Sequence, residues 1–341
     1  MTQSSTQNRR ILLASRPTGW PDASNFNLVT EKVPEPGPKD VLVRALWLSV
    51  DPYMRGRMSA AKSYAKPVEI GEVMTGGVVG QVVKSNHPAF KAGDIVEGSL
   101  GWQDYAVADA ALLRKIDPSL APIQTAVGIL GMPGMTAYFA FLEVCQPKAG
   151  DTVVVSGAAG AVGQIVGQLA KINGCRAVGI AGGDDKLDYI RRELGFDATI
   201  NYKTSNDLNK AIAAACPRGV DVYFDNVGGP VTDAVFNNLA FKSRIVICGQ
   251  ISQYNLDKPD LGPRNLRYML VNRARMEGFL VWDWRDRYPE ALKRISGWIK
   301  EGRIKYSEHV TEGLEKTPEA FIAMLKGANL GKALVKVADP A

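Results

Sequence analysis

The stretch Asp151–Lys171, DTVVVSGAAGAVGQIVGQLAK, constrains the fold of this chain more than any other. It opens with the apolar run Thr152–Val155, which is typical of a buried parallel strand. Gly157, Gly160 and Gly163 follow at GxxGxxG spacing, and an apolar-periodic helix comes after them. Glycines at such a turn let the backbone approach a pyrophosphate, and the helix N-terminus offers N–H groups and a positive dipole end to that anion. The stretch therefore predicts a dinucleotide-binding unit; the alternative is a tight turn that binds nothing.

Short strands and helices alternate after this stretch. Strands are expected at Arg176–Ala181, Ala198–Tyr202, Val220–Phe224 and Ser243–Cys248, and helices at Asp185–Leu194, Leu208–Ala215, Val231–Leu239 and Pro289–Lys300. Before it, Gln124–Leu142 has a helical pattern with an interruption at Gly131–Gly134. The alternation predicts an α/β fold with a doubly wound parallel sheet.

Residues 11 to about 120 have a different character. Val41–Trp47 and Gly77–Val83 are rich in β-branched residues and are bounded by Gly and Pro, which predicts a compact, barrel-like β domain. Two late strands, expected at Ile304–Val310 and Leu334–Val337, are candidates to return to it. We therefore expect a β domain over 1–122, a nucleotide-binding domain over 123–303, and a C-terminal segment over 304–341 that rejoins the first.

Composition excludes several classes of function. The net charge of +6 comes from 41 basic and 35 acidic residues without a basic cluster, which argues against nucleic-acid binding. Four dispersed cysteines without a CxxC, and only His87 and His309, argue against a metal site and favour reduced thiols in a cytoplasmic protein. Met1–Arg10 is polar and looks flexible, unlike a signal peptide. Glycines and a proline break the apolar region Ala126–Leu142, so it predicts core and not a membrane span.

Several strings of residues also resemble a known family. The most specific are DPYMRGRM at 51–58 and GMPGMTAY at 131–138; others are GWQDY at 101–105, YFDNVGG at 223–229 and GANLGK at 327–332. The chain resembles the zinc-independent medium-chain dehydrogenase/reductases over nearly its whole length. Within them it is most similar to the branch of prostaglandin and leukotriene reductases, plant alkenal double-bond reductases and bacterial curcumin reductase. The start, Asn8-Arg9-Arg10 with Leu13–Pro17, looks most like curcumin reductase.

The resemblance implies a GroES-like β domain and a Rossmann domain, usually paired into a homodimer. It implies reduction of the carbon–carbon double bond of α,β-unsaturated carbonyl compounds, curcumin-like or 15-oxo-prostaglandin-like, by hydride transfer from NADPH to the β-carbon. The cofactor contacts that it implies are Gly160, Ala161, Val162, Gly163, Gly182, Lys186, Tyr202, Asn226, Cys248 to Tyr254 (with Gly249, Ile251 and Ser252), Phe279, Leu280, Val281 and Asn329.

The end of the second expected strand bears on the choice of cofactor. An NAD site usually has an acidic residue here for the ribose 2′-hydroxyl. The small residues Gly182 and Gly183 leave room for a 2′-phosphate, which Lys186 and Tyr202 can contact. Asp184 is close enough in sequence to the end of this strand to keep NAD possible. The alternative for Lys186 is a solvated lysine on the face of a helix.

The chemistry itself is expected to depend on phenols. Tyr53 and Tyr64 are the candidate hydrogen-bond donors to the substrate carbonyl oxygen, where enolate charge develops. Their alternatives are core packing and an exposed loop position. The candidate substrate-binding residues are Trp102, Met132 and Tyr254.

One departure from the family leaves the proton donor open. Prostaglandin reductases place a tyrosine four residues before the Arg of their RMEAF string, whereas this chain has Val271 there and Tyr268 nearly one helical turn earlier. The cofactor ribose hydroxyl or a water molecule is the alternative donor. Two other functions remain as rivals, a quinone reductase of the same superfamily and an NADPH-binding protein without turnover.

Overall fold

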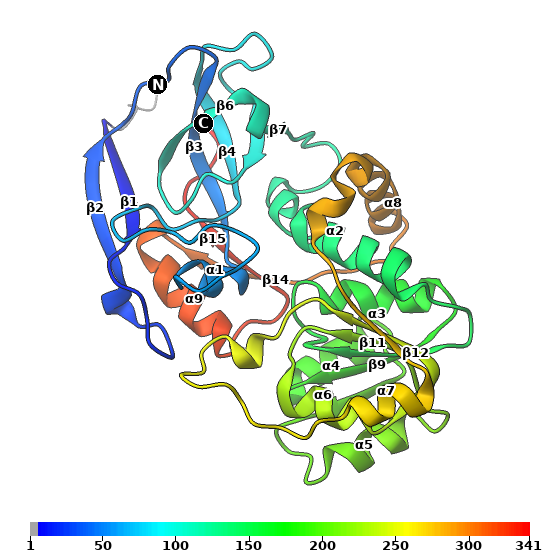
Figure 1. The fold of residues 1–341 in the computed structure, drawn as a ribbon. Helices are drawn as coiled ribbons and strands as arrows, with labels where there is room; N and C mark the ends of the chain where they lie inside the picture. Colours follow the sequence, from blue (N-terminus) through cyan, green and yellow to red (C-terminus); the bar gives the residue numbers. More distant parts are fainter. Residues whose placement is uncertain (1–5) are drawn as a thin grey trace. The chain divides into compact units, whose positions relative to one another are not determined.

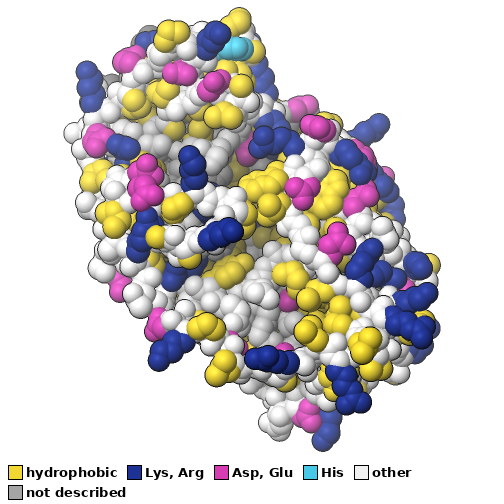
Figure 2. Space-filling model, viewed as in Figure 1, with side chains coloured by type: hydrophobic (Ala, Val, Ile, Leu, Met, Phe, Trp, Pro, Cys, Tyr) yellow, Lys and Arg dark blue, Asp and Glu magenta, His cyan; other side chains and the backbone are white. Residues whose placement is uncertain are grey.

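The structure is a computed structural model that describes residues 6–341. The chain divides into two compact units: one combines Met1–Gly128 with Glu308–Ala341, and the other is Ile129–Ser307. By compactness the chain therefore divides at 128/129 and 307/308, a few residues after the boundaries that the sequence suggested. On the face seen in Figure 2, Lys and Arg side chains lie interspersed with Asp and Glu side chains.

A seven-stranded sheet forms the centre of the first unit (Figure 1). Its strands follow the order β14-β15-β3-β4-β5-β7, and β6 also pairs with β3. Their bounds are β3 Asp40–Ser49, β4 Val78–Ser85, β5 Ile95–Gly98, β6 Tyr105–Asp109, β7 Arg114–Lys115, β14 Glu308–Glu312 and β15 Lys332–Lys336. Strand β15 runs antiparallel to β3 with Leu334 opposite Ser49, so the last strand of the chain belongs to the first sheet.

The expected strand over Ile304–Val310 was wrong in its first half. The backbone N–H groups of Lys305 and Ser307 donate to side-chain oxygens of Gln168 and Gln164, at 2.8 and 3.0 Å. These groups therefore have side-chain partners in place of a strand ladder, and β14 begins only at Glu308.

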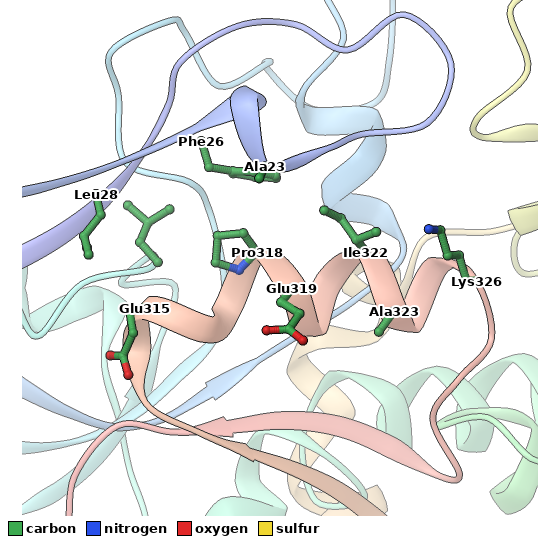
Figure 3. Close-up of a pocket in the computed structure, with 10 residues that line it drawn as sticks. Ala23, Phe26, Leu28, Glu315, Pro318, Glu319, Ile322, Ala323 and Lys326 are labelled. Carbon is green, nitrogen blue, oxygen red and sulfur yellow. The ribbon is translucent and has the colours of Figure 1, made fainter.

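A hairpin and a helix enclose an apolar groove in the first unit. The hairpin pairs β1 (Gln7–Leu13) with β2 (Phe26–Lys32), and the helix is α9 (Thr317–Leu325). Side chains from both elements line the groove, Phe26 and Leu28 from the hairpin and Pro318 and Ile322 from α9 (Figure 3). None of the site residues expected from the sequence lines it.

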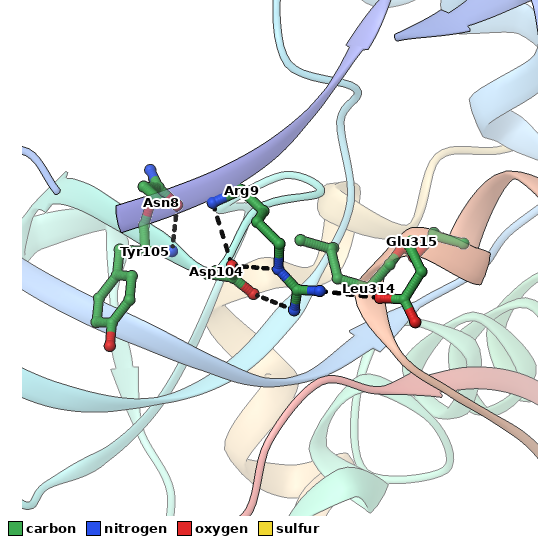
Figure 4. A network of polar contacts seen from close by, with 7 residues as sticks. Asn8, Arg9, Asp104, Tyr105, Leu314 and Glu315 are labelled. Atoms are coloured by element: carbon green, nitrogen blue, oxygen red, sulfur yellow. Dashed lines mark hydrogen bonds and ion pairs between the residues drawn. The ribbon is translucent and has the colours of Figure 1, made fainter. Parts of the chain in front are cut away.

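The hairpin is tied to the sheet by polar contacts near its start. Asn8 exchanges two hydrogen bonds of 2.9 Å with the backbone of Tyr105. The Arg9 guanidinium donates to both carboxylate oxygens of Asp104, at 2.9 and 3.1 Å, and to Glu315 at 2.9 Å (Figure 4). The expectation of a flexible start over Met1–Arg10 is therefore wrong from Gln7 onward, because β1 is paired there; residues 1–5 lie outside the described residues.

The remaining helices of the first unit are short. They are α1 Tyr53–Arg57 and the 3₁₀ turns η1 Ala23–Asn25, η2 Ala110–Leu112, η3 Ile123–Val127 and η7 Leu314–Lys316. The sequence pattern predicted neither α1 nor α9.

The second unit contains a six-stranded sheet in the order β10-β9-β8-β11-β12-β13, and every neighbouring pair in it is parallel (Figure 1). The bounds are β8 Thr152–Ser156, β9 Arg176–Ala181, β10 Ala198–Asn201, β11 Val220–Asp225, β12 Leu239–Ile247 and β13 Arg275–Gly278. Counted from β8, the order is 3-2-1-4-5-6, which is that of a Rossmann fold. The predicted doubly wound parallel sheet is confirmed.

Helices connect these strands and cover the sheet (Figure 1). They are α2 Met132–Phe139, α3 Gly163–Ile172, α4 Asp184–Arg192, α5 Leu208–Ala215, α6 Gly229–Phe236, α7 Leu266–Asn272 and α8 Tyr288–Lys300, with η4 Ala140–Cys145, η5 Ile251–Gln253 and η6 Val281–Arg287. The predicted bounds of α5 are confirmed and those of α4 and α8 are one or two residues off.

The predicted interruption at Gly131–Gly134 was misplaced. Helix α2 already begins at Met132, with Pro133 in its first turn, where a missing N–H costs nothing. Gly134 is required by close packing, since a Cβ there would lie 1.7 Å from the carbonyl oxygen of Ile129. The break in the helical pattern instead follows η3, whose last residue is Val127.

Candidate active site

The glycine turn lies between β8 and α3, as the sequence predicted. Gly157 has a φ of +60°, a value that favours glycine. A Cβ on Gly163 would lie 2.3 Å from the carbonyl oxygen of Gly157, so Gly163 lets the helix pack against the turn. A Cβ on Gly160 would lie 3.2 Å from the same oxygen. At the start of α3, the amides of Gln164 and Val166 donate to the carbonyls of Gly160 and Val162, both at 3.1 Å. The positive end of the helix dipole and the close approach that the glycines allow are therefore what suits this turn to a pyrophosphate.

The turn stands where the strand order reverses. β8 lies between β9 and β11, and open α/β sheets bind ligands at the carboxyl ends of strands at such a switch point. Asn226 follows β11 and ties the two strand ends together. Its backbone N–H donates to Ser156 Oγ at 2.9 Å, and its Nδ2 donates to the Ser156 carbonyl at 2.7 Å.

The residues expected at the 2′-phosphate gather at the end of β9. A Cβ on Gly182 would lie 2.6 Å from the Tyr202 ring and 2.8 Å from Cε of Lys203, so both side chains cover this glycine. Lys186 is half-buried, on the first turn of α4. Burial lowers the pKa of its ammonium group, Asp185 raises it, and Lys203 lowers it further. A second cation therefore lies near Lys186.

Sequence reasoning did not select Lys203, although its place directly after Tyr202 was an available signal. Asp184 has another partner, because Asn201 Nδ2 donates to its carboxylate at 2.9 Å. The acidic residue that kept NAD open is thus bound to the next strand.

The loop Cys248–Tyr254 packs on the residues that follow β11. Ser252 donates to the Val227 carbonyl through its N–H at 3.1 Å and through Oγ at 2.6 Å. The Tyr254 hydroxyl accepts from the Gln250 N–H at 3.2 Å, and burial raises the pKa of the Cys248 thiol to about 12. The two loops thus form one hydrogen-bonded surface at the ends of β11 and β12.

The remaining expected cofactor residues lie apart from this surface in the sequence. Phe279 to Val281 are half-buried and follow β13, and the Phe279 ring lies 5.8 Å from that of Trp284. Asn329 belongs to the first unit, where its Nδ2 donates to the Gly331 carbonyl at 2.7 Å.

Tyr53 and Tyr64 lie near each other in the first unit. Tyr53 is the first residue of α1. Burial, followed by the charges of Asp51 and Tyr64, raises the pKa of its phenol above the usual value of 10, while Arg57 and the Thr75 side chain lower it. The Tyr53 hydroxyl therefore keeps its proton at neutral pH. The Tyr64 side chain is 56% exposed, on the loop after α1.

A buried ion pair holds the segment before α1. Lys332 Nζ lies 3.2 Å from Asp51 Oδ1 and donates to the carbonyls of Val50 and Ala333, both at 2.7 Å. The Ser49 hydroxyl also donates to Asp51. These contacts fix the residues that lead into Tyr53.

Trp102 and Met132 differ in their surroundings. Trp102 is fully buried, stacked on Phe26 at 5.6 Å and edge-on to Phe321 at 5.7 Å. This burial favours a packing role over the predicted contact with substrate. Met132 is 37% exposed at the start of α2.

The departure at Val271 is visible in the structure. Val271 is on α7 and 60% exposed, whereas Tyr268 packs against the core cluster of the second unit. The Tyr268 side chain therefore packs into the core, and its nearness to Val271 in the sequence does not make it a substitute for the missing tyrosine.

Residues 6–341 contain neither a metal-binding cluster nor a membrane-spanning helix. Among them, no group of three or more His, Cys, Asp or Glu side chains is arranged to hold a metal ion. Within the same residues, no helix combines the length and the apolar character needed to cross a membrane.

The fold and these loops define a protein with a Rossmann dinucleotide-binding unit and a GroES-like β unit. Residues 9–116 match a family described as the N-terminal domain of oxidoreductase, and residues 161–297 match one described as zinc-binding dehydrogenase. The chain belongs to the medium-chain dehydrogenase/reductase superfamily, which confirms the resemblance drawn from the sequence.

Individual relatives cover almost the whole chain. The NADPH-dependent curcumin reductase of Escherichia coli is 45% identical over 343 residues, 99% of each chain. The NADP-dependent 2-alkenal reductase of Nicotiana tabacum is 45% identical over 336 residues, 97% of each chain. The crystal structure of CurA from Vibrio vulnificus in complex with NADPH superposes with a TM-score of 0.93 at 46% identity, covering 97% of this chain and 100% of that one.

Proposed function

We propose that this chain reduces the carbon–carbon double bond of α,β-unsaturated carbonyl compounds with NADPH. The observation that carries the proposal is the glycine turn at the switch point of the parallel sheet, with Lys186 in the first turn of α4 and Tyr202 directly after β10. The 45% identity to a curcumin reductase and to a 2-alkenal reductase points to the reaction. Enones and enals are the substrate class.

Three groups of residues would hold the cofactor. Gly160 to Gly163 and the start of α3 would bind the pyrophosphate. Tyr202 and Lys203, which cover Gly182, and Lys186, whose Cγ would lie 3.8 Å from a Cβ on Gly183, would bind the 2′-phosphate. The loops around Asn226 and Cys248–Tyr254, with Phe279–Val281 and Asn329, would hold the remainder. When bound, NADPH supplies a hydride.

The protein's own chemical task is to stabilise charge on the substrate. Negative charge grows on the carbonyl oxygen as the β-carbon is reduced, and the α-carbon then takes a proton. Tyr53, whose pKa is raised, and Tyr64 are the proposed hydrogen-bond donors to that oxygen. Met132 and Tyr254 are the proposed contacts for the rest of the substrate.

A turnover panel tests the function. The purified protein is given NADPH with an enal, an enone or a quinone, the absorbance of the reduced nicotinamide is followed, and the products are identified by mass spectrometry. The expected product is the saturated aldehyde or ketone. Turnover of quinones alone would identify a quinone reductase instead. NADPH binding without oxidation by any acceptor would identify a binding protein.

We also propose a homodimer that forms through β13. All four residues of this strand are exposed, and β12 is its one neighbour among the described strands. Edge strands offer unpaired N–H and C=O groups to a second chain. Exposed apolar side chains lie close in sequence, with Leu270 79%, Val271 60% and Met276 46% exposed. Light scattering on wild type and on Met276→Pro should show a dimer and a monomer; a monomeric wild type would contradict the proposal.

Zinc independence and a cytoplasmic location complete the proposal. The first is supported by the dispersed cysteines and by the lack of a metal-binding group among residues 6–341, although the family that matches 161–297 is described as zinc-binding. The second is supported by the free thiols, since all four cysteines are unpaired in the described chain.

A further inference from the structure

One buried carboxylate, that of Asp225, lies at the end of β11 beneath both loops that follow β11 and β12. Its side chain is fully buried and accepts from five groups. Oδ1 accepts from the hydroxyls of Ser156 and Tyr223 at 3.0 and 2.9 Å. Oδ1 also accepts from the N–H groups of Val227 and Gly228, both at 2.9 Å. Oδ2 accepts from the Thr232 hydroxyl at 2.7 Å.

These contacts come from four parts of the chain. Ser156 ends β8, Tyr223 is on β11 itself, Val227 and Gly228 belong to the loop after β11, and Thr232 lies in the first turn of α6. Two successive glycines with positive φ join this loop to α6, Gly228 in the loop at +72° and Gly229 at the start of α6 at +59°. A loop of this composition is conformationally free, so it needs anchors to keep one shape. The Asp225 carboxylate supplies two of them.

The backbone of the same residue holds the second loop. The Asp225 carbonyl accepts from the N–H groups of Cys248 and Gly249 at 2.8 and 3.1 Å. Through its carboxylate and its carbonyl, Asp225 therefore fixes the starting points of both loops. Asp225 is fully buried, so it can act on a ligand only through the two loops that it holds.

We infer that Asp225 is the positioning residue for the nicotinamide half of the cofactor. This inference rests on the proposed function. A Rossmann sheet consists of two mononucleotide-binding halves, here β8-β9-β10 and β11-β12-β13. The glycine turn and Lys186 belong to the first half, which takes the adenosine part, and the loops that Asp225 holds belong to the second.

The test compares two ligands on one variant. Asp225→Asn keeps the shape of the side chain but places an NH₂ group among donors. We expect it to weaken NADPH binding by about tenfold or more, the equivalent of one lost hydrogen bond to a charged group. Binding of 2′,5′-ADP, which lacks the nicotinamide half, should stay within about twofold of wild type. Both dissociation constants are measured by calorimetry.

Asp221→Asn is the matched control. Asp221 lies at the opposite end of β11 and accepts from the Thr152 N–H at 2.8 Å, so it also joins β11 to β8 but touches no loop of the site. A stability effect without positioning would lower the melting temperature of both variants and leave the NADPH constant of both unchanged. Thr232→Val, which removes one donor to Asp225, covers the case in which Asp225→Asn does not fold and should weaken NADPH binding by a smaller factor.

The outcomes separate the inference from the proposed function. Equal losses for NADPH and 2′,5′-ADP in Asp225→Asn, or no loss for either, would overturn the positioning role. If Asp225→Asn does not fold, an unchanged NADPH constant in Thr232→Val would overturn it too. A wild-type protein that binds neither ligand would instead overturn the proposed function.

Discussion

Removal of the Lys186 ammonium group gives the sharpest test of the cofactor site. Lys186→Met keeps most of the apolar stem and removes the charge, so the packing of this half-buried side chain is largely preserved. NADPH carries a 2′-phosphate and NADH a hydroxyl. The variant should therefore lose affinity for NADPH and keep its affinity for NADH.

The magnitude follows from the contact that is lost. A hydrogen bond to a charged group contributes roughly 1.5–3 kcal/mol, and about 1.4 kcal/mol corresponds to a factor of ten. The NADPH Michaelis constant should rise by about tenfold to a hundredfold. Because Lys203 also lies beside Gly182, it retains part of the attraction, so the single variant belongs at the lower end of that range. Lys203→Met should give a smaller rise, and the double variant a rise larger than either.

The pH dependence offers a second readout. Burial lowers the pKa of Lys186 below 10.5 in the free protein, whereas a bound phosphate favours the ammonium form and raises it. NADPH affinity should be fully present below the lowered pKa and should fall as the pH rises through it. NADH affinity should show no such fall, and in Lys186→Met the part of the NADPH fall that is due to Lys186 should disappear.

The assay measures steady-state kinetics with both cofactors from pH 7 upward, where the phosphate is a dianion. Lys210→Met is the control, since Lys210 is 85% exposed on α5 and pairs with Asp207. Equal losses for NADPH and NADH in Lys186→Met would mean that the residue supports the fold. An unchanged Michaelis constant for both cofactors would show that Lys186 does not contact the 2′-phosphate.

Three further predictions address the turn, the phenols and the metal. Gly160→Val should abolish measurable NADPH binding while the protein still folds. Gly163→Ala places a Cβ 2.3 Å from a backbone oxygen, so it should also lower the melting temperature. Normal NADPH affinity in Gly160→Val would show that the loop is only a turn. Tyr64→Phe should lower the turnover number by at most about 10²-fold, and by more than it raises the Michaelis constant; Tyr53→Phe should have a milder effect. Wild-type turnover in both variants and in the double variant would mean that the ribose hydroxyl or solvent donates the proton. Exhaustive chelation should leave activity unchanged, and stoichiometric zinc whose removal stops turnover would contradict this.

The parallel sheet of the second unit was predictable because its signals are local. Val153, Val154 and Val155 are fully buried, and an apolar run of this kind is what a strand with both faces covered requires. The glycines of the turn are required sterically, since a Cβ on Gly163 would collide with the carbonyl oxygen of Gly157. Alternation of such strands with amphipathic helices leaves few topologies, so the doubly wound parallel sheet could be predicted from the pattern, and the structure supplied the order 3-2-1-4-5-6.

The elements of the first unit were harder to predict, because they depend more on contacts between residues distant in the sequence. Strand β1 is polar in sequence, and its pairing with β2 and the Arg9 contacts to Asp104 and Glu315 hold it in place. Helix α9 is nine residues long and has a weak helical pattern, and the burial of Phe321 against Trp102 stabilises it. Neither kind of contact leaves a periodic trace in the sequence.

The sequence by itself determined the nucleotide-binding fold and the family, because both rest on motifs whose residues are close together in the chain. It also predicted the cofactor residues that the proposed function uses. Only the tertiary structure decided which side chains join them from elsewhere. Lys203 becomes a candidate because its stem covers Gly182, and Asp184 loses its place because Asn201 binds it. Asp225 holds two loops because β8, β11 and α6 meet at its carboxylate, 69 residues from Ser156 along the chain. Hydrogen bonds and charges act through distance in space, and spacing along the chain does not give that distance.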